Sequence, residues 1–95
     1  MAWRIDKQTN GKFAIHSSRI DDYIVIDADE LQIAQIYAEK GVKVYLASAR
    51  AQMTTRVSHT DAEGEAKIEA SRQRGATPKE GEVAIGVTGF TYSDD

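Results

Sequence analysis

Cysteine is absent from this 95-residue sequence, proline occurs once, and there is no long apolar run. The lack of cysteine excludes a disulfide framework, a thiolate zinc site and a cysteine nucleophile. No segment approaches the ~18–20 apolar residues that span a bilayer. Asp6 also interrupts the first apolar residues too early for a signal peptide. We therefore expect a soluble cytoplasmic protein without a membrane partner, a virion component being the other cysteine-free class.

The sequence also lacks a large excess of either sign of charge. The sequence has 12 Lys and Arg against 15 Asp and Glu, which gives a formal net charge of -3. Residues 48–80 carry six cations and five anions, so this central segment is close to neutral. Tight binding to duplex nucleic acid requires a surplus of cations that displaces counterions from the phosphates. Duplex nucleic acid is therefore not an expected partner.

Large apolar side chains are unevenly distributed along the chain. Between residues 47 and 81 only Met53, Val57 and Ile68 are large and apolar, whereas both flanking segments are rich in such residues. A chain of this length supports one hydrophobic core, and burial of apolar surface drives its formation. We expect one domain over residues 1–95, divided into a body (2–46 plus 82–92), a central excursion (about 47–74) and a flexible loop (75–81).

The body is predicted to begin with a β-hairpin. Asn10-Gly11 lies between two alternating segments and indicates a turn. A two-residue loop would place Phe13 on the face of Gln8. A three-residue loop with Gly11 in the left-handed conformation instead brings four apolar residues to one face, namely Trp3, Ile5, Phe13 and Ile15. We predict this second register, followed by a strand at residues 23–26, which are apolar on both faces.

The main helix is expected at about residues 28–40. Asp27 is predicted to be its N-cap, and Gly41 is predicted to end it in the left-handed conformation. The apolar residues of this helix spread over more than half of its circumference, whereas packing on one sheet requires a stripe of only ~100° or a little more. Ile33 and Ile36 form most of the surplus. Either the central excursion or another chain is expected to cover them.

The central excursion is predicted to form a long β-hairpin arm. From residue 42 to residue 58, apolar and polar side chains alternate, a period of two that a helix fits poorly. A turn at residues 61–64 and renewed alternation at residues 66–71 would pair Val57 with Ile68. Two-stranded ribbons are marginal in water. The arm is therefore expected to rest on a partner and to be separable from the folding of the body.

A helix over residues 61–74 is the competing interpretation. Thr60 to Glu63 would form its capping box, and Gly75 would end it. Gly64 in the first turn and an apolar face made mainly of alanine count against this helix. The predicted fold is α+β: a small antiparallel sheet with one main helix and a long central β-hairpin arm.

The predicted function is non-enzymatic. We expect a small protein–protein interaction module, of the kind common among phage-encoded inhibitors and assembly factors, that binds another protein or a second copy of itself. The expected contact residues lie on the surplus face of the main helix and along the arm: Ile33, Ile36, Arg50, Met53, Arg56, Val57, Arg72 and Arg74.

Two other functions remain open. One is a small-ligand or nucleotide-binding oligomer in which the arginines of the arm meet a pocket at a subunit boundary. The other is a hydrolase that uses His59, which requires a cleft that a hairpin tip does not supply. His16 is expected to face solvent. No motif predicts a cofactor, and the acidic cluster around residues 21–30 lacks the spacing of a calcium loop, so no metal is expected.

Overall fold

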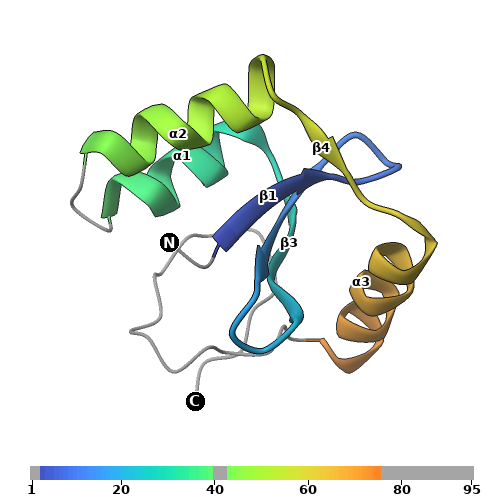
Figure 1. Cartoon of the computed structure of the whole chain (residues 1–95). Helices are drawn as coiled ribbons and strands as arrows, with labels where there is room; N and C mark the ends of the chain where they lie inside the picture. The colour runs from blue at the N-terminus through green and yellow to red at the C-terminus, as the bar shows by residue number, and fades with distance from the viewer. Residues whose placement is uncertain (1–2, 40–42, 76–95) are drawn as a thin grey trace.

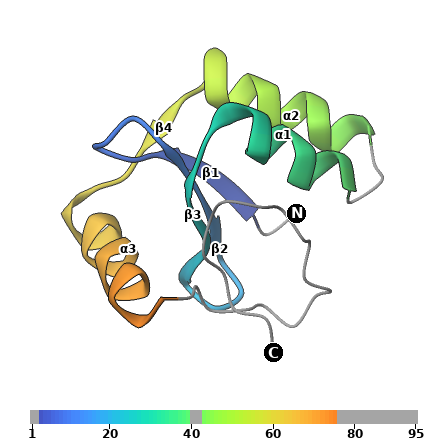
Figure 2. The ribbon, with the colours of Figure 1, turned by 180° about the vertical axis from the view of Figure 1, so that it is seen from behind.

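A computed structural model describes residues 3–39 and 43–75 of the chain. Within these residues the elements follow the order β1 (Trp3–Lys7), β2 (Phe13–Ser17), β3 (Asp22–Ala28), α1 (Glu30–Glu39), α2 (Lys43–Thr54), β4 (Ser58–His59) and α3 (Ala62–Arg74). The strands form one four-stranded sheet, and helices lie on both of its faces (Figure 1, Figure 2). The predicted α+β class is confirmed.

The first hairpin has the predicted register. Ile5 lies opposite Ile15, and the Gln8 amide donates to the Lys12 carbonyl over 2.7 Å to close a three-residue loop. Gly11 has a φ of 86°, in the left-handed region that glycine adopts without strain. This loop places the apolar residues of β1 and β2 on one face of the sheet, as the alternation predicted.

The sheet is mixed, so the prediction of a purely antiparallel sheet is wrong at one edge. The strand order is β3-β2-β1-β4, and β4 runs parallel to β1, with Asp6 opposite Ser58 and Lys7 opposite His59. The reason is the path of the chain. The helix pair α1–α2 takes the chain from β3, at one edge of the sheet, to the opposite edge. There β4 pairs with β1 and runs in the same direction (Figure 1).

Helices α1 and α2 cover one face of the sheet, and α3 covers the other (Figure 2). The larger core lies under α1 and α2 and consists of Ile5, Phe13, Ile15, Ile24, Val25, Ala28, Ile33, Ile36, Tyr37, Ala49 and Met53. The smaller core lies under α3 and consists of Ala14, Tyr23, Ile26 and Ile68. Because both faces are covered, β2 is buried at every position.

The predicted β-hairpin arm does not form. Residues 43–54 are helix α2 and residues 62–74 are helix α3. Most of the alternating apolar positions in α2 are alanines, and alanine has the highest helix propensity of all residues. The β-branched residues that favour a strand lie near the two ends of α2, at Val44 and at Thr54, with Thr55 and Val57 just beyond it. Between residues 47 and 52 the alternation consists of alanine and polar residues, and it did not indicate a strand.

The competing interpretation of residues 61–74 is the correct one. Asp61 is the N-cap of α3, and its side chain accepts a hydrogen bond of 2.7 Å from the amide of Gly64. Gly75 ends the helix with a φ of 81°. Acidic residues occupy the first turn of α3 and basic residues its last turn, the distribution that the helix dipole favours. These local signals outweigh the helix-weakening effect of Gly64.

The main helix, α1, begins later than predicted. Asp29 and Gln32 form a reciprocal capping box: the Gln32 amide donates to Asp29 Oδ1 over 2.7 Å, and the Asp29 amide donates to Gln32 Oε1 over 2.9 Å. Asp27, the predicted N-cap, still belongs to β3 and has a φ of 57°. A left-handed residue at the end of β3 turns the chain toward the helix.

The surplus apolar face of α1 is covered from within. Ile33 is 0% exposed and Ile36 is 2% exposed, and both belong to the core that α2 closes. Ile33 and Ile36 are therefore core residues, and their predicted role as contact residues is wrong. Helix α2 supplies the second surface that the breadth of this apolar face required.

The remaining predictions on the body lie outside the described residues. These are the end of the main helix at Gly41, the loop beyond Gly75 and the part of the body at residues 82–92. No helix within the described ranges has the length and apolar character needed to cross a membrane.

Candidate functional site

The outer surface of the α1–α2 pair carries a shallow groove of about 420 Å³. Its lining comes from the first turns of α1 and the last turns of α2: Glu30, Leu31, Ala34, Arg50, Met53 and Thr54. We call this feature the α1–α2 groove. Two of the predicted contact residues, Arg50 and Met53, meet in it, although they were predicted to lie on a strand.

Leu31 is the most exposed large apolar residue among those described. It is 77% exposed, against 37% for Ile20. The capping box at Asp29 and Gln32 fixes the start of α1 and so places Leu31 in the first turn. Two residues along a helix are about 200° apart around its axis. Burial of Ile33 against the sheet therefore turns Leu31 outward, toward the rim of the groove.

The groove combines an apolar floor with one charge of each sign. Met53 is 7% exposed and forms part of the floor. Glu30 and Arg50 line the groove and are exposed. In residues 3–39 and 43–75, no ion pair involves either of these two side chains. A partner can therefore meet both charges without breaking an ion pair among the described residues.

A cluster of polar side chains lies on the opposite face of the sheet, beneath α3. The Asp6 carboxylate is 2% exposed and accepts three hydrogen bonds: from Arg4 Nε over 2.9 Å, from Arg4 Nη2 over 2.8 Å and from the Tyr23 hydroxyl over 2.7 Å. Burial and then the neighbouring Asp6 carboxylate raise the pKa of Tyr23. The hydrogen bonds from Arg4 satisfy the buried carboxylate, as a buried charge requires.

A polar pocket of about 170 Å³ opens beside this cluster. It is lined by Arg4, His16, Asp21, Tyr23, Asp61, Glu63, Gly64 and Lys67. Lys67 Nζ lies 2.8 Å from the Asp21 carbonyl, 3.4 Å from Asp21 Oδ1 and 3.9 Å from Glu63 Oε1. This ammonium lowers the pKa of Asp21. The contacts of Lys67 with Asp21 join α3 to the β2–β3 connection.

His16 was expected to face solvent, and this expectation is wrong. The residue is 9% exposed, and its ring meets the Tyr23 ring edge to face at a centroid distance of 5.1 Å. Its Nε2 lies 3.4 Å from Asp21 Oδ1. The alternation placed His16 on the second face of the sheet correctly. The sequence did not show that α3 covers that face.

Gly64 permits the close approach of α3 to the sheet. A Cβ at this position would lie 2.9 Å from the Tyr23 hydroxyl oxygen. Gly64→Ala is therefore expected to lower the free energy of unfolding by about 1–2 kcal/mol, although alanine normally favours a helix over glycine by about 1 kcal/mol. In a Tyr23→Phe background the contact is removed, and the alanine is expected to be neutral or stabilising. Urea unfolding of the four proteins in this cycle provides the measurement, and an equal penalty in both backgrounds would contradict the contact.

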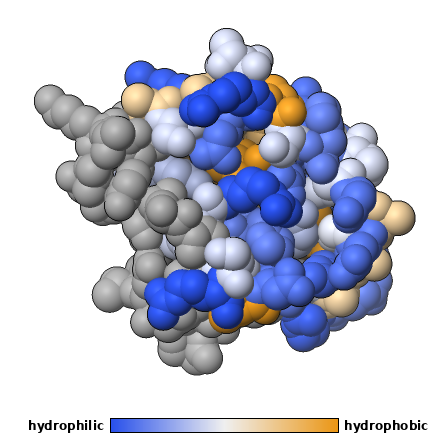
Figure 3. Space-filling model, viewed as in Figure 1, coloured by the Kyte–Doolittle hydropathy of each residue, from blue (hydrophilic) through white to orange (hydrophobic). Residues whose placement is uncertain are grey.

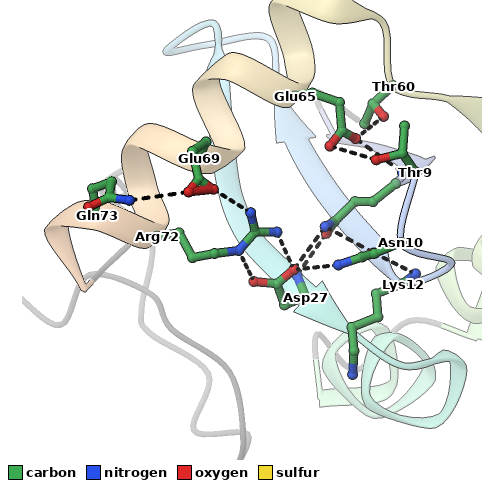
Figure 4. A network of polar contacts seen from close by, with 10 residues as sticks. Thr9, Asn10, Lys12, Asp27, Thr60, Glu65, Glu69, Arg72 and Gln73 are labelled. Carbon is green, nitrogen blue, oxygen red and sulfur yellow. Dashed lines mark hydrogen bonds and ion pairs between the residues drawn. The ribbon is translucent and has the colours of Figure 1, made fainter.

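A second polar network fastens the β1–β2 loop and the end of β3 to α3 (Figure 4). Arg72 makes a bidentate contact with Asp27, with Nε 2.9 Å from Oδ2 and Nη2 2.7 Å from Oδ1. Gln8 Nε2 and Asn10 Nδ2 also donate to Asp27. Mainly because of Arg72, the pKa of Asp27 falls to about 2. Arg72, a predicted contact residue, is therefore held within the chain.

This ion pair predicts a dependence of stability on pH. Because the pKa of Asp27 is about 2 in the folded protein and about 3.9 in an unfolded chain, the pair stabilises the protein fully above the unfolded value. Its contribution is lost as the pH falls toward the folded value. Arg72→Gln should therefore lower stability at pH 6 by on the order of 1 kcal/mol, because the pair is partly exposed.

The measurement is urea unfolding of wild type and Arg72→Gln between pH 6 and pH 2. The difference in unfolding free energy between them is expected to stay constant above about pH 5 and to shrink toward pH 2. Arg56→Gln is the matched control, because Arg56 is exposed and none of the ion pairs in residues 3–39 and 43–75 includes it. A difference that persists unchanged at pH 2 would contradict the role of Asp27.

The other predicted contact residues do not converge on one surface. Arg74 lies at the end of α3 and donates to Ser71 Oγ over 2.8 Å. Arg56 is exposed and Val57 is half-buried in the segment between α2 and β4. Arg50 and Arg72 belong to helices on opposite faces of the sheet (Figure 2). Arg50 and Arg72 therefore do not line one anion-binding pocket.

The histidine of the hydrolase hypothesis lies in an open position. His59 is exposed on β4 and lines neither of the two pockets described above. Among residues 3–39 and 43–75, no three histidine, aspartate or glutamate side chains are grouped so that they could hold a metal ion.

Leu31, Glu30 and the buried Asp6 cluster are the features that sequence reasoning missed. For Leu31 a signal was present, because Asp29 and Gln32 have the spacing of a capping box around it. For Asp6 and Tyr23, which are 17 residues apart, local sequence carried no such signal. Comparison of the chain with models of known families, with curated proteins and with solved structures finds no match.

Proposed function

We propose that this protein is a non-enzymatic protein-binding module that contacts its partner through the α1–α2 groove. The observation that carries the proposal is Leu31, a large aliphatic side chain that is 77% exposed at the rim of a groove with an apolar floor. Glu30 and Arg50 would contact the polar groups of the partner. Inhibitors and assembly factors, the class expected from the sequence, act by contacts of this kind.

The composition of the groove supports binding to a protein. Interface cores are enriched in aromatic residues, methionine and arginine, inside a polar rim that excludes water, and Met53 and Arg50 line this groove. A single exposed leucine is common on protein surfaces. Leu31 differs because it adjoins a groove of about 420 Å³, a size that accommodates several side chains of a partner. On the face seen in Figure 3, the apolar areas are small and separated by hydrophilic side chains.

The alternative functions have less support from the geometry. A nucleotide or other anionic ligand would require arginines that converge, whereas Arg50 and Arg72 lie on opposite sides of the sheet. The polar pocket beneath α3 contains cations, but Lys67 and Arg4 are held by carboxylates of the chain itself. The protein-binding proposal uses Glu30 and Arg50, which make no ion pair with the described residues.

Site-specific photo-crosslinking tests this function. A photo-reactive phenylalanine analogue at position 31 is expected to give a discrete protein adduct in a lysate of the native host, and Arg50→Glu should weaken it. The control carries the same analogue at position 12, which is exposed in the β1–β2 loop. Adducts of equal yield at both positions, or no adduct at position 31, would overturn the proposal.

A further inference from the structure

We infer that the partner bound in the α1–α2 groove is a second copy of this chain. This inference rests on the proposed function and names the occupant. The two copies would meet around a twofold axis, each inserting Leu31 against the groove of the other, with Glu30 of one copy facing Arg50 of the second copy.

The first argument is that the groove is complementary to itself. In a twofold interface the same patch occurs on both sides, so each patch must supply both halves of every contact. The α1–α2 groove contains a protruding aliphatic residue, an apolar floor that includes Met53, one acid and one base. A foreign partner needs no such balance of charge in the groove it contacts.

The second argument is that these two charges are available. In the part of the chain that the structure describes, the cations beside the other polar sites are each held by a carboxylate: Arg4 by Asp6, Lys67 by Asp21, and Arg72 by Asp27. Glu30 and Arg50 make no ion pair with described residues. Charges of opposite sign across an interface favour one partner and one register.

The size of the patch indicates a weak dimer. Stable interfaces usually bury ~1,200–2,000 Å² in total, and the groove is lined by only six residues. Association is therefore expected to be weak, with monomer dominant in dilute solution. Each copy has a mass of 10.5 kDa.

Sedimentation velocity with charge-exchanged variants tests the inference. The wild type should shift from the 10.5 kDa monomer toward twice that mass as its concentration rises. Glu30→Arg leaves two bases in the groove, and Arg50→Glu leaves two acids. Each variant alone should associate about tenfold more weakly or worse, because like charges then face each other. An equimolar mixture of the two should restore association.

The mixture separates a second copy from any foreign partner, because only two facing copies make the two changes compensate. Thermal melting of each variant checks that the fold is intact, as expected for exposed positions. A wild type that stays monomeric at every concentration would overturn the inference, while an adduct with another protein at position 31 would still support the proposed function. A dimeric wild type whose variants also dimerise separately would likewise overturn it, because the contact would lie elsewhere.

Discussion

Ile36→Glu is expected to unfold the protein. Ile36 is 2% exposed and lies in the core beside Ile33 and Tyr37. The other described members of this core are apolar side chains and the Tyr37 ring, and burying an unpaired charge costs several kcal/mol. Because domains of this size have total stabilities of only about 5–15 kcal/mol, most of the population should lose its structure. Far-UV circular dichroism and thermal melting measure this directly.

Leu31→Glu is the matched control on the same helix. Leu31 is 77% exposed, so the substitution removes little buried surface and should change the free energy of unfolding by less than about 0.5 kcal/mol. The same change should reduce partner binding, because it places an acid at the centre of the proposed contact. If Ile36→Glu stayed folded while Leu31→Glu unfolded, the assignment of the inner and outer faces of α1 would be wrong.

Replacing residues 52–72 with a short glycine-containing turn is expected to abolish folding. Met53 closes the core under α2, and Ile68, which is 0% exposed, closes the core under α3. The replacement also removes β4 and the Gln52 side chain that accepts a hydrogen bond of 2.9 Å from the Ile5 amide. The sequence had predicted that this segment is separable from the folding of the body, whereas the burial of Met53 and Ile68 leads us to expect the opposite. A collapsed two-dimensional ¹H–¹⁵N spectrum and the loss of a cooperative melt are the expected readouts.

A small change within the same segment provides the control. Substituting glycine at Thr55 and Arg56, both exposed in the connection after α2, should leave a cooperative melt with only a modest loss of stability. A shortened chain that still melted cooperatively would show that one sheet face folds without α3.

The fold was predicted correctly where the turn residues and the large apolar side chains indicated the same structure. Gly11 and the paired apolar residues of β1 and β2 specified the hairpin register. For residues 43–54, alternation suggested a strand, although a helical spacing was also present: Ala49 and Met53, four residues apart, are both buried. In α3 the buried positions Gly64, Ile68 and Ser71 likewise follow a helical spacing. Ala49, Gly64 and Ser71 are small, so the helical period is weak in the hydrophobicity of the sequence.

The candidate site was predicted in part. Arg50 and Met53 line the groove, but the surplus apolar face of α1 was assigned to a partner because its internal cover, α2, had been taken for a strand. Burial of Ile33 and Ile36 beneath α2 then makes Leu31 the outward apolar residue. The burial of the Asp6 cluster depends on α3, which is distant from β1 in the sequence. Local sequence does not show that α3 packs on this face of the sheet.

Solvent accessibility of individual methyl groups tests the central claim most directly, namely that Leu31 marks a contact face while Ile33 and Ile36 belong to the core. With a soluble paramagnetic agent, the methyl signals of Leu31 should be strongly attenuated in a dilute sample and should recover as the protein concentration rises. Those of Ile33 and Ile36 should stay intense throughout, as their exposures of 0% and 2% require. Attenuation of Ile36 as strong as that of Leu31 would contradict the account of the two faces of α1, and a Leu31 signal that never recovers with concentration would contradict the pairing of two copies.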